Sequence, residues 1–319
     1  MITYADVVAA RERLRGVAVH TPLIRSAALS TPETSVWFKP ESLQPIGSFK
    51  LRGAYNRIAA LSPEVRAAGV IAYSSGNHAQ GVAYAARAFG IPALIVMPDD
   101  APRVKIEATR VLGAEVVLYD PQTQKREDVA ARLMHGQTLV PPFNDPYVMA
   151  GQGTIGLEIF DDLPEVDQVW VPIGGGGMIS GVAAALRHLR PSVLIIGVEP
   201  ELADDARRSK AAGQVVEITG AQASRTLADG VRTLAVGALT FEHIRAQVDA
   251  IVTVSEAQLR EAARHLILSE KLVVEPTGAL PLAAWRAHAG EFPNAKQVVH
   301  VISGGNIDPA LLAELVQER

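Results

Sequence analysis

Lys50 is the residue whose neighbours best suit it to covalent chemistry. It occurs in the run GSFKLRGA, residues 47–54, where a helix is predicted to begin at about Ser48. A lysine that acts as a covalent amine must be held rigidly and desolvated, because desolvation lowers its pKa and frees its lone pair to attack a carbonyl. The run by itself does not separate this role from that of a solvated surface lysine.

A second candidate for chemistry is a stretch of four glycines, residues 174–177. It follows the predicted strand 169–173 and precedes the predicted helix 179–189. Without Cβ atoms, successive backbone N–H groups can converge on an anion, and the helix N-terminus adds its dipole. No lysine adjoins the glycines, and their spacing is not that of a dinucleotide fingerprint. We interpret the stretch as a phosphate loop, with a tight turn as the ordinary alternative.

Two further polar segments follow predicted strands. The segment 74–80, SSGNHAQ, opens the predicted helix Asn77–Phe89 and offers hydroxyl, amide, imidazole and backbone N–H groups that suit a carboxylate, although it could be a simple N-cap. The segment 303–306, SGGN, ends the last predicted strand, where a serine is usually a turn or cap residue. Ligands of open α/β sheets bind beyond the carboxyl ends of strands, so all these segments can face one cleft.

In this order, the segments resemble those of fold-type II pyridoxal phosphate (PLP) enzymes, above all serine/threonine dehydratases, serine racemase and threo-3-hydroxyaspartate dehydratase. The resemblance extends from residue 21 to residue 308, nearly the whole chain. It implies that Lys50 condenses with the aldehyde of PLP. The other cofactor-binding positions that it implies are Phe49, Asn77 at the phenolic oxygen, Gly174, Gly175, Gly176, Gly177 and Met178 at the phosphate, and Ser303 at the pyridine nitrogen.

The same resemblance assigns a substrate side to the cleft. The substrate carboxylate is expected at Ser75, Asn77, His78 and Gln80, and the segment 229–233 also matches positions on this side. Arg126 could pair with a β-carboxylate, as in 3-hydroxyaspartate, or could be a solvated helix residue. Glu275 matches a family glutamate near the cofactor that has no assigned role here.

The expected reaction is β-elimination. Lys50, displaced from PLP by the amino acid, would remove the α-proton; the β-hydroxyl would leave, and the product would hydrolyse to a 2-keto acid and ammonia. The substrate could be L-threonine, L-serine or threo-3-hydroxyaspartate. Ser75 matches the serine that exchanges the α-proton on the opposite ring face in serine racemase, so racemisation is the alternative. Two other hypotheses are a β-replacement synthase and an inactive ligand-binding protein. The retention of Lys50 with its motifs argues against the inactive protein.

A metal site is a weaker expectation. Glu199 and Asp205, with the carbonyl of Ala203 between them, follow the predicted strand 194–198 and could hold Mg²⁺ or Mn²⁺ through oxygen ligands. The ordinary alternative is an acidic helix start, which the helix dipole favours. Serine racemase and hydroxyaspartate dehydratases have a divalent metal on this pattern, and the resemblance implies a structural role for it.

The fold class predicted from the pattern is α/β, because short apolar β-branched runs alternate with alanine-rich helical stretches. Strands that are apolar throughout indicate parallel sheets covered by helices on both faces. The segment 69–145 holds four strand–helix units and could close as a small sheet. The resemblance to the tryptophan synthase β-like fold implies a large PLP-binding domain, 1–60 and 146–319, and a small substrate-closing domain, 61–145.

Composition narrows the class of protein. The chain has 319 residues, is 48% hydrophobic, has a net charge of -4 and contains no cysteine, which excludes disulfides and thiolate chemistry. The charge and the lack of a basic run argue against nucleic acid or a membrane as partner. The first residues lack the pattern of a signal peptide, so a cytoplasmic protein is expected. The family suggests a homodimer. Because the sequence ends soon after residue 308, we expect no C-terminal regulatory domain.

Overall fold

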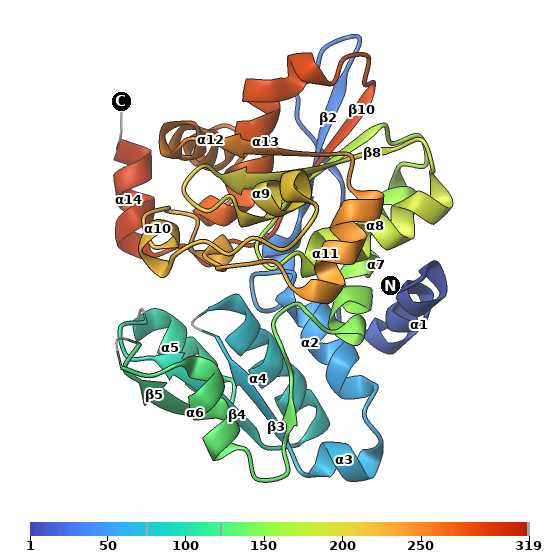
Figure 1. Cartoon of the computed structure of the whole chain (residues 1–319). Helices are drawn as coiled ribbons and strands as arrows, with labels where there is room; N and C mark the ends of the chain where they lie inside the picture. Colours follow the sequence, from blue (N-terminus) through green and yellow to red (C-terminus); the bar gives the residue numbers. More distant parts are fainter. Residues whose placement is uncertain (75, 102, 122, 318–319) are drawn as a thin grey trace.

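Two separate β-sheets organise the chain, one in the upper and one in the lower part of Figure 1. The structure, a computed structural model, describes residues 1–74, 76–101, 103–121 and 123–317. The larger sheet has the strand order β1-β2-β10-β7-β8-β9, and the smaller one has the order β5-β4-β3-β6. The strands of the larger sheet are β1 (Ile24–Arg25), β2 (Ser35–Pro40), β10 (Gln297–Ile302), β7 (Gln168–Pro172), β8 (Leu194–Pro200) and β9 (Ala250–Val254). Those of the smaller sheet are β5 (Glu115–Tyr119), β4 (Ala93–Pro98), β3 (Val70–Tyr73) and β6 (Thr138–Leu139).

Helices cover both sheets and connect their strands. The α-helices are α1 (Tyr4–Leu14), α2 (Lys50–Ala59), α3 (Pro63–Ala67), α4 (Asn77–Phe89), α5 (Arg103–Val111), α6 (Arg126–Leu133), α7 (Pro146–Asp162), α8 (Gly177–Leu189), α9 (Asp205–Ala212), α10 (Gly220–Ala223), α11 (Ala238–Gln247), α12 (Glu256–Leu268), α13 (Pro276–His288) and α14 (Pro309–Gln317). Three short 3₁₀ helices are described as well, η1 (Glu41–Leu43), η2 (Asp229–Val231) and η3 (Ala289–Glu291).

The predicted α/β class with parallel sheets is confirmed. Every described strand pairing is parallel except that of β1 with β2. Strand β7 is buried at every position, as expected for a strand covered on both faces. Strands β1 and β6, which the sequence pattern did not indicate, have only two residues each, too few to show a hydrophobic period.

Helix α2 lies between the two sheets and packs on both sides (Figure 1). Its residues Ala54 and Ile58 join the core of the smaller sheet, together with Val82 of α4. Its other side packs against α7 of the larger unit, where a Cβ on Gly151 would lie 2.5 Å from the carbonyl oxygen of Arg52. The helix that begins at Lys50 is therefore held from both domains. The exact domain limits, 1–60 with 146–319 and 61–145, stay a prediction.

Within the described residues, we find no helix with both the length and the apolar character that crossing a membrane requires.

His300 on β10 makes the stability of the fold sensitive to acid. Neither ring nitrogen has a hydrogen-bond partner in the described part of the chain, and the rings of Phe38, Trp170 and Trp285 surround it. Burial, and secondarily the charge of Arg286, lowers the pKa of His300 from 6.5 to about 3. Below pH 6.5 the unfolded chain binds a proton that the folded chain excludes, so stability present above pH 6.5 is lost progressively down to about pH 3.

We expect His300→Leu to flatten this acid dependence. Between pH 7 and pH 5, the loss in free energy of unfolding should be smaller in the variant by up to about 2 kcal/mol, since one pKa unit corresponds to about 1.4 kcal/mol. Urea unfolding at both pH values measures the difference. His135→Leu, at an exposed position, is the matched control and should behave as wild type. Equal pH slopes in wild type and His300→Leu would contradict the assignment.

Candidate active site

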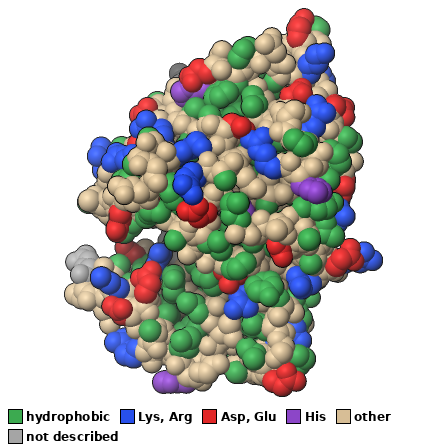
Figure 2. All heavy atoms as spheres, turned by 45° about the vertical axis from the view of Figure 1, so that its right-hand side comes forward, with side chains coloured by type: hydrophobic (Ala, Val, Ile, Leu, Met, Phe, Trp, Pro, Cys, Tyr) green, Lys and Arg blue, Asp and Glu red, His purple; other side chains and the backbone are tan. Residues whose placement is uncertain are grey.

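A cavity of about 320 Å³ lies between the two sheets, and residues of both units line it. In the space-filling view, the surface is notched between the upper and lower parts of the molecule, with acidic and basic side chains at the notch (Figure 2). The lining comes from the start of α2, the β3–α4 connection, α5, residues 142–143, the glycine loop, η2, residues 275–277 and the end of β10. Three of the four sequence motifs follow strands β3, β7 and β10, which explains why they meet here.

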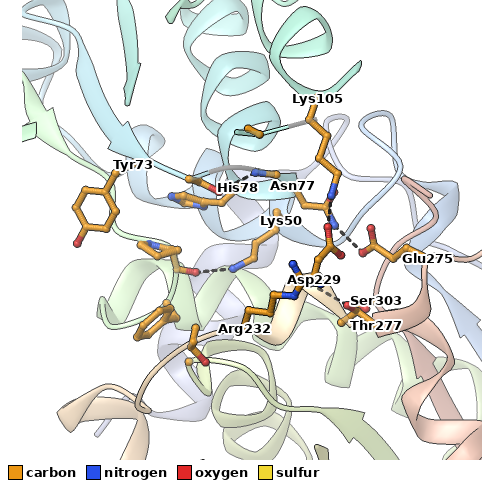
Figure 3. Close-up of a pocket in the computed structure, with 18 of the residues that line it drawn as sticks. Lys50, Tyr73, Asn77, His78, Lys105, Asp229, Arg232, Glu275, Thr277 and Ser303 are labelled. Carbon is orange, nitrogen blue, oxygen red and sulfur yellow. Dashed lines mark hydrogen bonds and ion pairs between the residues drawn. The ribbon is translucent and has the colours of Figure 1, made fainter. Parts of the chain in front are cut away.

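Lys50 points into this cavity from the first turn of α2 (Figure 3). Its Nζ donates a hydrogen bond to the carbonyl oxygen of Pro142 at 2.7 Å. Burial of the amine lowers the pKa of Lys50 from 10.5 to about 8, against the opposing effect of the Glu275 charge. An amine with this pKa is partly unprotonated near neutral pH, which is the state needed for nucleophilic attack or proton removal.

The loop before Lys50 is bonded to the segment after β10. The N–H of Phe49 donates to the carbonyl oxygen of Ser303 at 3.1 Å, and the N–H of Gly305 donates to that of Gly47 at 2.9 Å. Gly47 has φ +69, and a Cβ there would lie 2.5 Å from Oδ1 of Asn306. Only glycine fits such a position without strain. The lysine motif and the Ser303 motif are thus one continuous piece of structure.

The third motif joins them through amide side chains. Nδ2 of Asn306 donates to Oδ1 of Asn77 at 2.8 Å and to the carbonyl oxygen of Ile46 at 2.9 Å. Nδ2 of Asn77 in turn donates to Oε1 of Glu275 at 2.7 Å. Burial, and then the nearby charge of Asp229, raises the pKa of Glu275 to about 7, although Lys105, Asn77 and Lys50 counter the rise. The site therefore contains a carboxyl group that is partly protonated at neutral pH.

Two serine hydroxyl groups near this point lack a hydrogen-bond partner in the described part of the protein. The Oγ atoms of Ser303 and of Ser48 are buried and have no hydrogen-bond partner among the residues that the structure describes. A buried polar atom without a partner is costly, so such an atom indicates that a ligand is needed to satisfy it. Ser303 also lines the cavity. Its role at a ring nitrogen of a bound cofactor stays a prediction.

The glycine loop connects β7 with the N-terminus of α8. Gly176 has φ +86, and a Cβ there would lie 2.9 Å from both Oγ1 of Thr240 and Cδ1 of Ile244. Oγ1 of Thr240 donates to the carbonyl oxygen of Gly175 at 2.7 Å and so holds the loop in place. A small cavity of about 40 Å³ lies against the loop, with Lys50, Phe49, Ser303 and Met178 also in its lining. The predicted phosphate loop and the predicted amine therefore border the same space.

The predicted substrate side is assembled only in part. His78 lines the cavity, but its Nε2 lies 2.8 Å from the carbonyl oxygen of Val140, to which it must donate. Burial, and then the charge of Lys50, lowers the pKa of His78 to about 3 and keeps the ring neutral. Its Nδ1 can then only accept, so the ring offers no N–H to a carboxylate. The backbone N–H groups at the start of α4 can do so instead.

The other predicted substrate residues differ in their placement. Gln80 is buried along α4 and is not among the described residues that line the cavity. Arg126 does line it, at the outer rim; its Nε donates to Glu127 at 2.8 Å and its guanidinium lies 5.1 Å from the centre of the Tyr73 ring. Ser75, the residue predicted to decide between elimination and racemisation, lies outside the described residues.

An ion pair that the sequence did not indicate spans the cavity. Nζ of Lys105 on α5 contacts Oδ2 of Asp229 on η2, and so connects the lower unit with the upper one (Figure 3). Lys105 lies within α5, and no motif surrounds it. Tyr73 and Pro142 also line the cavity without a motif. Their roles depend on the packing of the two units rather than on local pattern.

The predicted metal position contains two buried carboxylates. Glu199 accepts hydrogen bonds from the backbone N–H groups of Ala206 at 2.9 Å and Arg207 at 2.8 Å, and so caps α9. Neither oxygen of Asp205 has a hydrogen-bond partner of normal geometry in the described structure. Burial raises the pKa of Asp205 to about 7, although the backbone N–H groups of Asp205 and Val236 partly counter it.

Two carboxylates and a carbonyl oxygen are donors of the kind that a divalent cation binds, and the metal site stays a prediction. A group of three or more His, Cys, Asp or Glu side chains suited to a metal is absent from the described residues.

Comparisons with known proteins show the family of the chain. Residues 15–304 match the family model described as "Pyridoxal-phosphate dependent enzyme". The chain is 45% identical over 318 residues to an L-threo-3-hydroxyaspartate ammonia-lyase from Pseudomonas sp, across 99% of this chain and 98% of that relative. It is also 45% identical over 321 residues to an L-threonine ammonia-lyase from Thermotoga maritima, across 100% of this chain and 79% of that relative.

Among solved structures, maize serine racemase is similar with a TM-score of 0.93 and 36% sequence identity, over 98% of this chain and 96% of that one. The family model, the relatives and the fold all point to the same conclusion. The chain belongs to the pyridoxal-phosphate-dependent enzymes of fold type II.

Proposed function

We propose that this protein is an ammonia-lyase that eliminates the β-hydroxyl group of a 3-hydroxy amino acid and releases a 2-keto acid and ammonia. The substrate class comprises L-threonine, L-serine and threo-3-hydroxyaspartate. The observation that carries the proposal is the enclosed amine of Lys50, with its pKa lowered to about 8, in a cavity shared with the glycine loop and the N-terminus of α4. The ammonia-lyases among the relatives support it.

The residues at the site fit PLP. Lys50 would bind its aldehyde carbon, the loop Gly174–Gly177 its phosphate, Asn77 its phenolic oxygen, and the unpartnered hydroxyl of Ser303 its ring nitrogen. When bound, PLP withdraws electron density from the α-carbon of the amino acid and so makes the α-proton acidic. A neutral hydroxyl at the ring nitrogen leaves that nitrogen largely unprotonated, which suits early departure of the β-substituent.

The chain itself supplies binding and proton transfer. The free amine of Lys50 accepts the α-proton, and the carbonyl oxygen of Pro142 holds the resulting ammonium. Backbone N–H groups at the start of α4 bind the substrate carboxylate, and the helix dipole strengthens the contact. The two units line the site on both sides, and burial of the amine limits the water around it.

A racemase activity on serine is the second candidate. The similarity to maize serine racemase favours it, as does 42% identity to a serine racemase from Schizosaccharomyces pombe over 96% of this chain and 94% of that relative. Removal of the α-proton by Lys50 is common to both reactions. They differ in whether the proton returns from the other face, where Ser75 is proposed to act, before the hydroxyl leaves.

One assay tests the proposal and separates the candidates. The PLP-loaded protein is incubated with L-serine, L-threonine and L-threo-3-hydroxyaspartate, and keto acid, ammonia and D-serine are measured. We expect keto acid and ammonia in equal amounts from at least one substrate. D-serine alone would favour the racemase. Product only after addition of an external nucleophile, or none at all, would contradict the lyase assignment.

We expect the ion pair between Lys105 and Asp229 to strengthen substrate binding by holding the two units together. Lys105→Met should raise KM about fivefold and change kcat less, because a partly buried pair contributes about 1 kcal/mol. Steady-state kinetics with the best substrate measure this. Arg110→Met, which removes an exposed ion pair with Glu107 on the same helix, is the matched control. An unchanged KM in Lys105→Met would contradict the role.

We further propose that the protein is a homodimer. We also propose that Glu199, Asp205 and the carbonyl of Ala203 bind a structural Mg²⁺ or Mn²⁺. We expect Mg²⁺ to raise the melting temperature of wild type, since an ion at 100 times its Kd adds about 2.7 kcal/mol of stability. Asp205→Asn should lose this response. Asp249→Asn, which breaks the ion pair with Arg187, should keep it. A response to Mg²⁺ that persists in Asp205→Asn would exclude the site.

A further inference from the structure

A buried group of four charged side chains lies behind the active site. It comprises Lys39 on β2, Glu41 on η1, Arg52 on α2 and Glu158 on α7, and we refer to it as the buried charge cluster. The exposed fractions of these side chains are 0%, 0%, 1% and 10%. With two cations and two carboxylates the cluster is neutral, which makes its burial tolerable. Arg52 lies in the run 47–54 that carries Lys50, and the other three residues lie outside the motifs discussed above.

Arg52 is the centre of the cluster. Its Nε and one terminal nitrogen donate to the two oxygens of Glu41 at 2.7 and 2.9 Å, and its two terminal nitrogens donate to the two oxygens of Glu158 at 2.6 and 2.8 Å. Further bonds run to Oγ1 of Thr154 at 3.0 Å and to the carbonyl oxygen of Val19 at 3.1 Å. Each pair of hydrogen bonds to a carboxylate fixes the plane of the guanidinium. Two such pairs therefore leave the group a single position and orientation.

These bonds tie α2 to parts of the chain that do not belong to the cavity. Glu41 precedes α2, and Thr154 and Glu158 lie on α7. Close contact of the two helices reinforces the attachment, because the N–H of Gly53 also donates to Oε1 of Gln152 at 3.1 Å. At its own start, α2 has Phe49 as N-cap, and no side-chain capping bond is made there by any described residue. Besides the backbone bonds of Gly47 and Phe49 with the segment after β10, the beginning of the helix is therefore held by Arg52 and its neighbours.

Lys50 and Arg52 are two residues apart on one helix. At about 100° per residue their side chains leave the helix about 200° apart, on nearly opposite sides. Lys50 points into the cavity (Figure 3). Arg52 points away from it, to Glu41 and Glu158 of the large unit. Any rotation or sliding of α2 would move both side chains together, so whatever fixes the guanidinium also fixes the amine.

We propose that Arg52 is a positioning residue for Lys50. Its bonds to Glu41 and Glu158 set the rotation and axial position of α2, and thereby hold the Lys50 amine in its enclosed place against the carbonyl oxygen of Pro142. The part of this inference that concerns turnover rests on the proposed function; the part that concerns the amine does not. Lysine in place of Arg52 keeps the charge but cannot bond to both carboxylates at once.

The test compares Arg52→Lys with a matched control, Arg187→Lys. Arg187, at the far end of α8, donates to the carbonyl oxygens of Gln247, Pro191 and Val193 and pairs with Asp249, remote from the cavity. The pKa of the Lys50 amine is measured on the cofactor-stripped full chain, from the pH dependence of its acetylation by acetic anhydride, followed by mass spectrometry. The midpoint of this dependence does not depend on how accessible the amine is.

In Arg52→Lys we expect the pH midpoint of Lys50 acetylation to lie at least about one pH unit above that of wild type. Such a rise lowers the fraction of free amine at pH 7 about tenfold. The PLP-loaded variant should lose about tenfold in kcat, with the pH profile displaced in the same direction and KM little changed. Arg187→Lys should lower the melting temperature without moving the midpoint or the pH profile. An unmoved midpoint in Arg52→Lys would overturn the proposal.

A second variant keeps the proposal testable if Arg52→Lys does not fold. The double variant Arg52→Gln with Glu41→Gln removes one cation and one carboxylate, and leaves the ion pair of Lys39 with Glu158 charge-balanced. The same rise of the Lys50 midpoint is expected, and its absence would overturn the proposal. If no amino acid is turned over even by wild type, the proposed function fails, while the acetylation midpoints still decide the role of Arg52.

Discussion

Replacement of Lys50 with alanine is expected to abolish turnover of every amino acid and to remove the visible absorbance of the PLP–lysine linkage. We propose the amine both as the covalent anchor of PLP and as the base at the α-carbon, and burial lowers its pKa to about 8. Loss of a positioned base alone costs up to about 10⁴-fold in rate, and loss of the anchor adds to this. The absorbance spectrum of the purified protein and an assay of keto acid release measure the two effects.

Lys210→Ala is the matched control for this experiment. Lys210 is also partly buried with a lowered pKa, and its Nζ donates to the carbonyl oxygen of Val248 at 2.8 Å, away from the cavity. The control should keep the spectrum and the activity, because partial burial of an amine does not by itself create a binding site for PLP. Retention of either signal in Lys50→Ala would remove Lys50 from the centre of the mechanism.

Gly176→Ala is expected to have the second largest effect, on the affinity for PLP. Gly176 has φ +86, and the added Cβ would lie 2.9 Å from Thr240 and from Ile244. The strained backbone costs about 1–2 kcal/mol, and the clash can be relieved only by moving the loop. Because the phosphate would be bound by N–H groups whose directions the loop sets, a loss of about 3 kcal/mol is expected, or roughly 100-fold in Kd. Titration with PLP, followed by absorbance, measures it.

Gly213→Ala separates loss of the site from loss of stability. Gly213 has φ +70, close to that of Gly176, but an added Cβ would meet open space in the described structure. It ends α9, away from the glycine loop. The control should therefore have a similar backbone cost and a lower melting temperature with unchanged affinity for PLP. If both variants bind PLP as wild type does, the loop 174–177 is not the phosphate site.

The elements of the fold could be predicted because their signals are local. Helix α4 begins and ends where the pattern indicated, at Asn77–Phe89, since apolar spacing and flanking turn residues lie within the segment. Helix α2 begins at Lys50, two residues later than predicted. Ser48 instead forms a β-bridge with Gly304, a contact with the far end of the chain that local pattern does not reveal.

The site could be predicted only where a motif follows a strand. The rule that ligands bind beyond the carboxyl ends of strands predicted that the glycine loop, the start of α4 and Ser303 could face one cleft, and all three line the cavity. Because β3 belongs to the other sheet, only the packing of the two units brings the start of α4 to the other two motifs. The rule did not place Lys105, which reaches Asp229 only because the lower unit packs beneath the upper one. Nor did it show that the ring of His78 is engaged by Val140, which leaves the carboxylate to the backbone.

From the sequence alone, the chain's α/β class, its family and the lysine proposed to react follow, because each is encoded in contiguous residues whose spacing and chemistry are readable without the fold. Tertiary structure decided what surrounds that lysine. Its hydrogen-bond acceptor lies 92 residues away in sequence, the partner of Asn77 lies 198 away, and Glu158 lies 106 residues from Arg52. Contacts over such separations depend on how the whole chain packs, and they set the burial and the charges that give the amine its pKa.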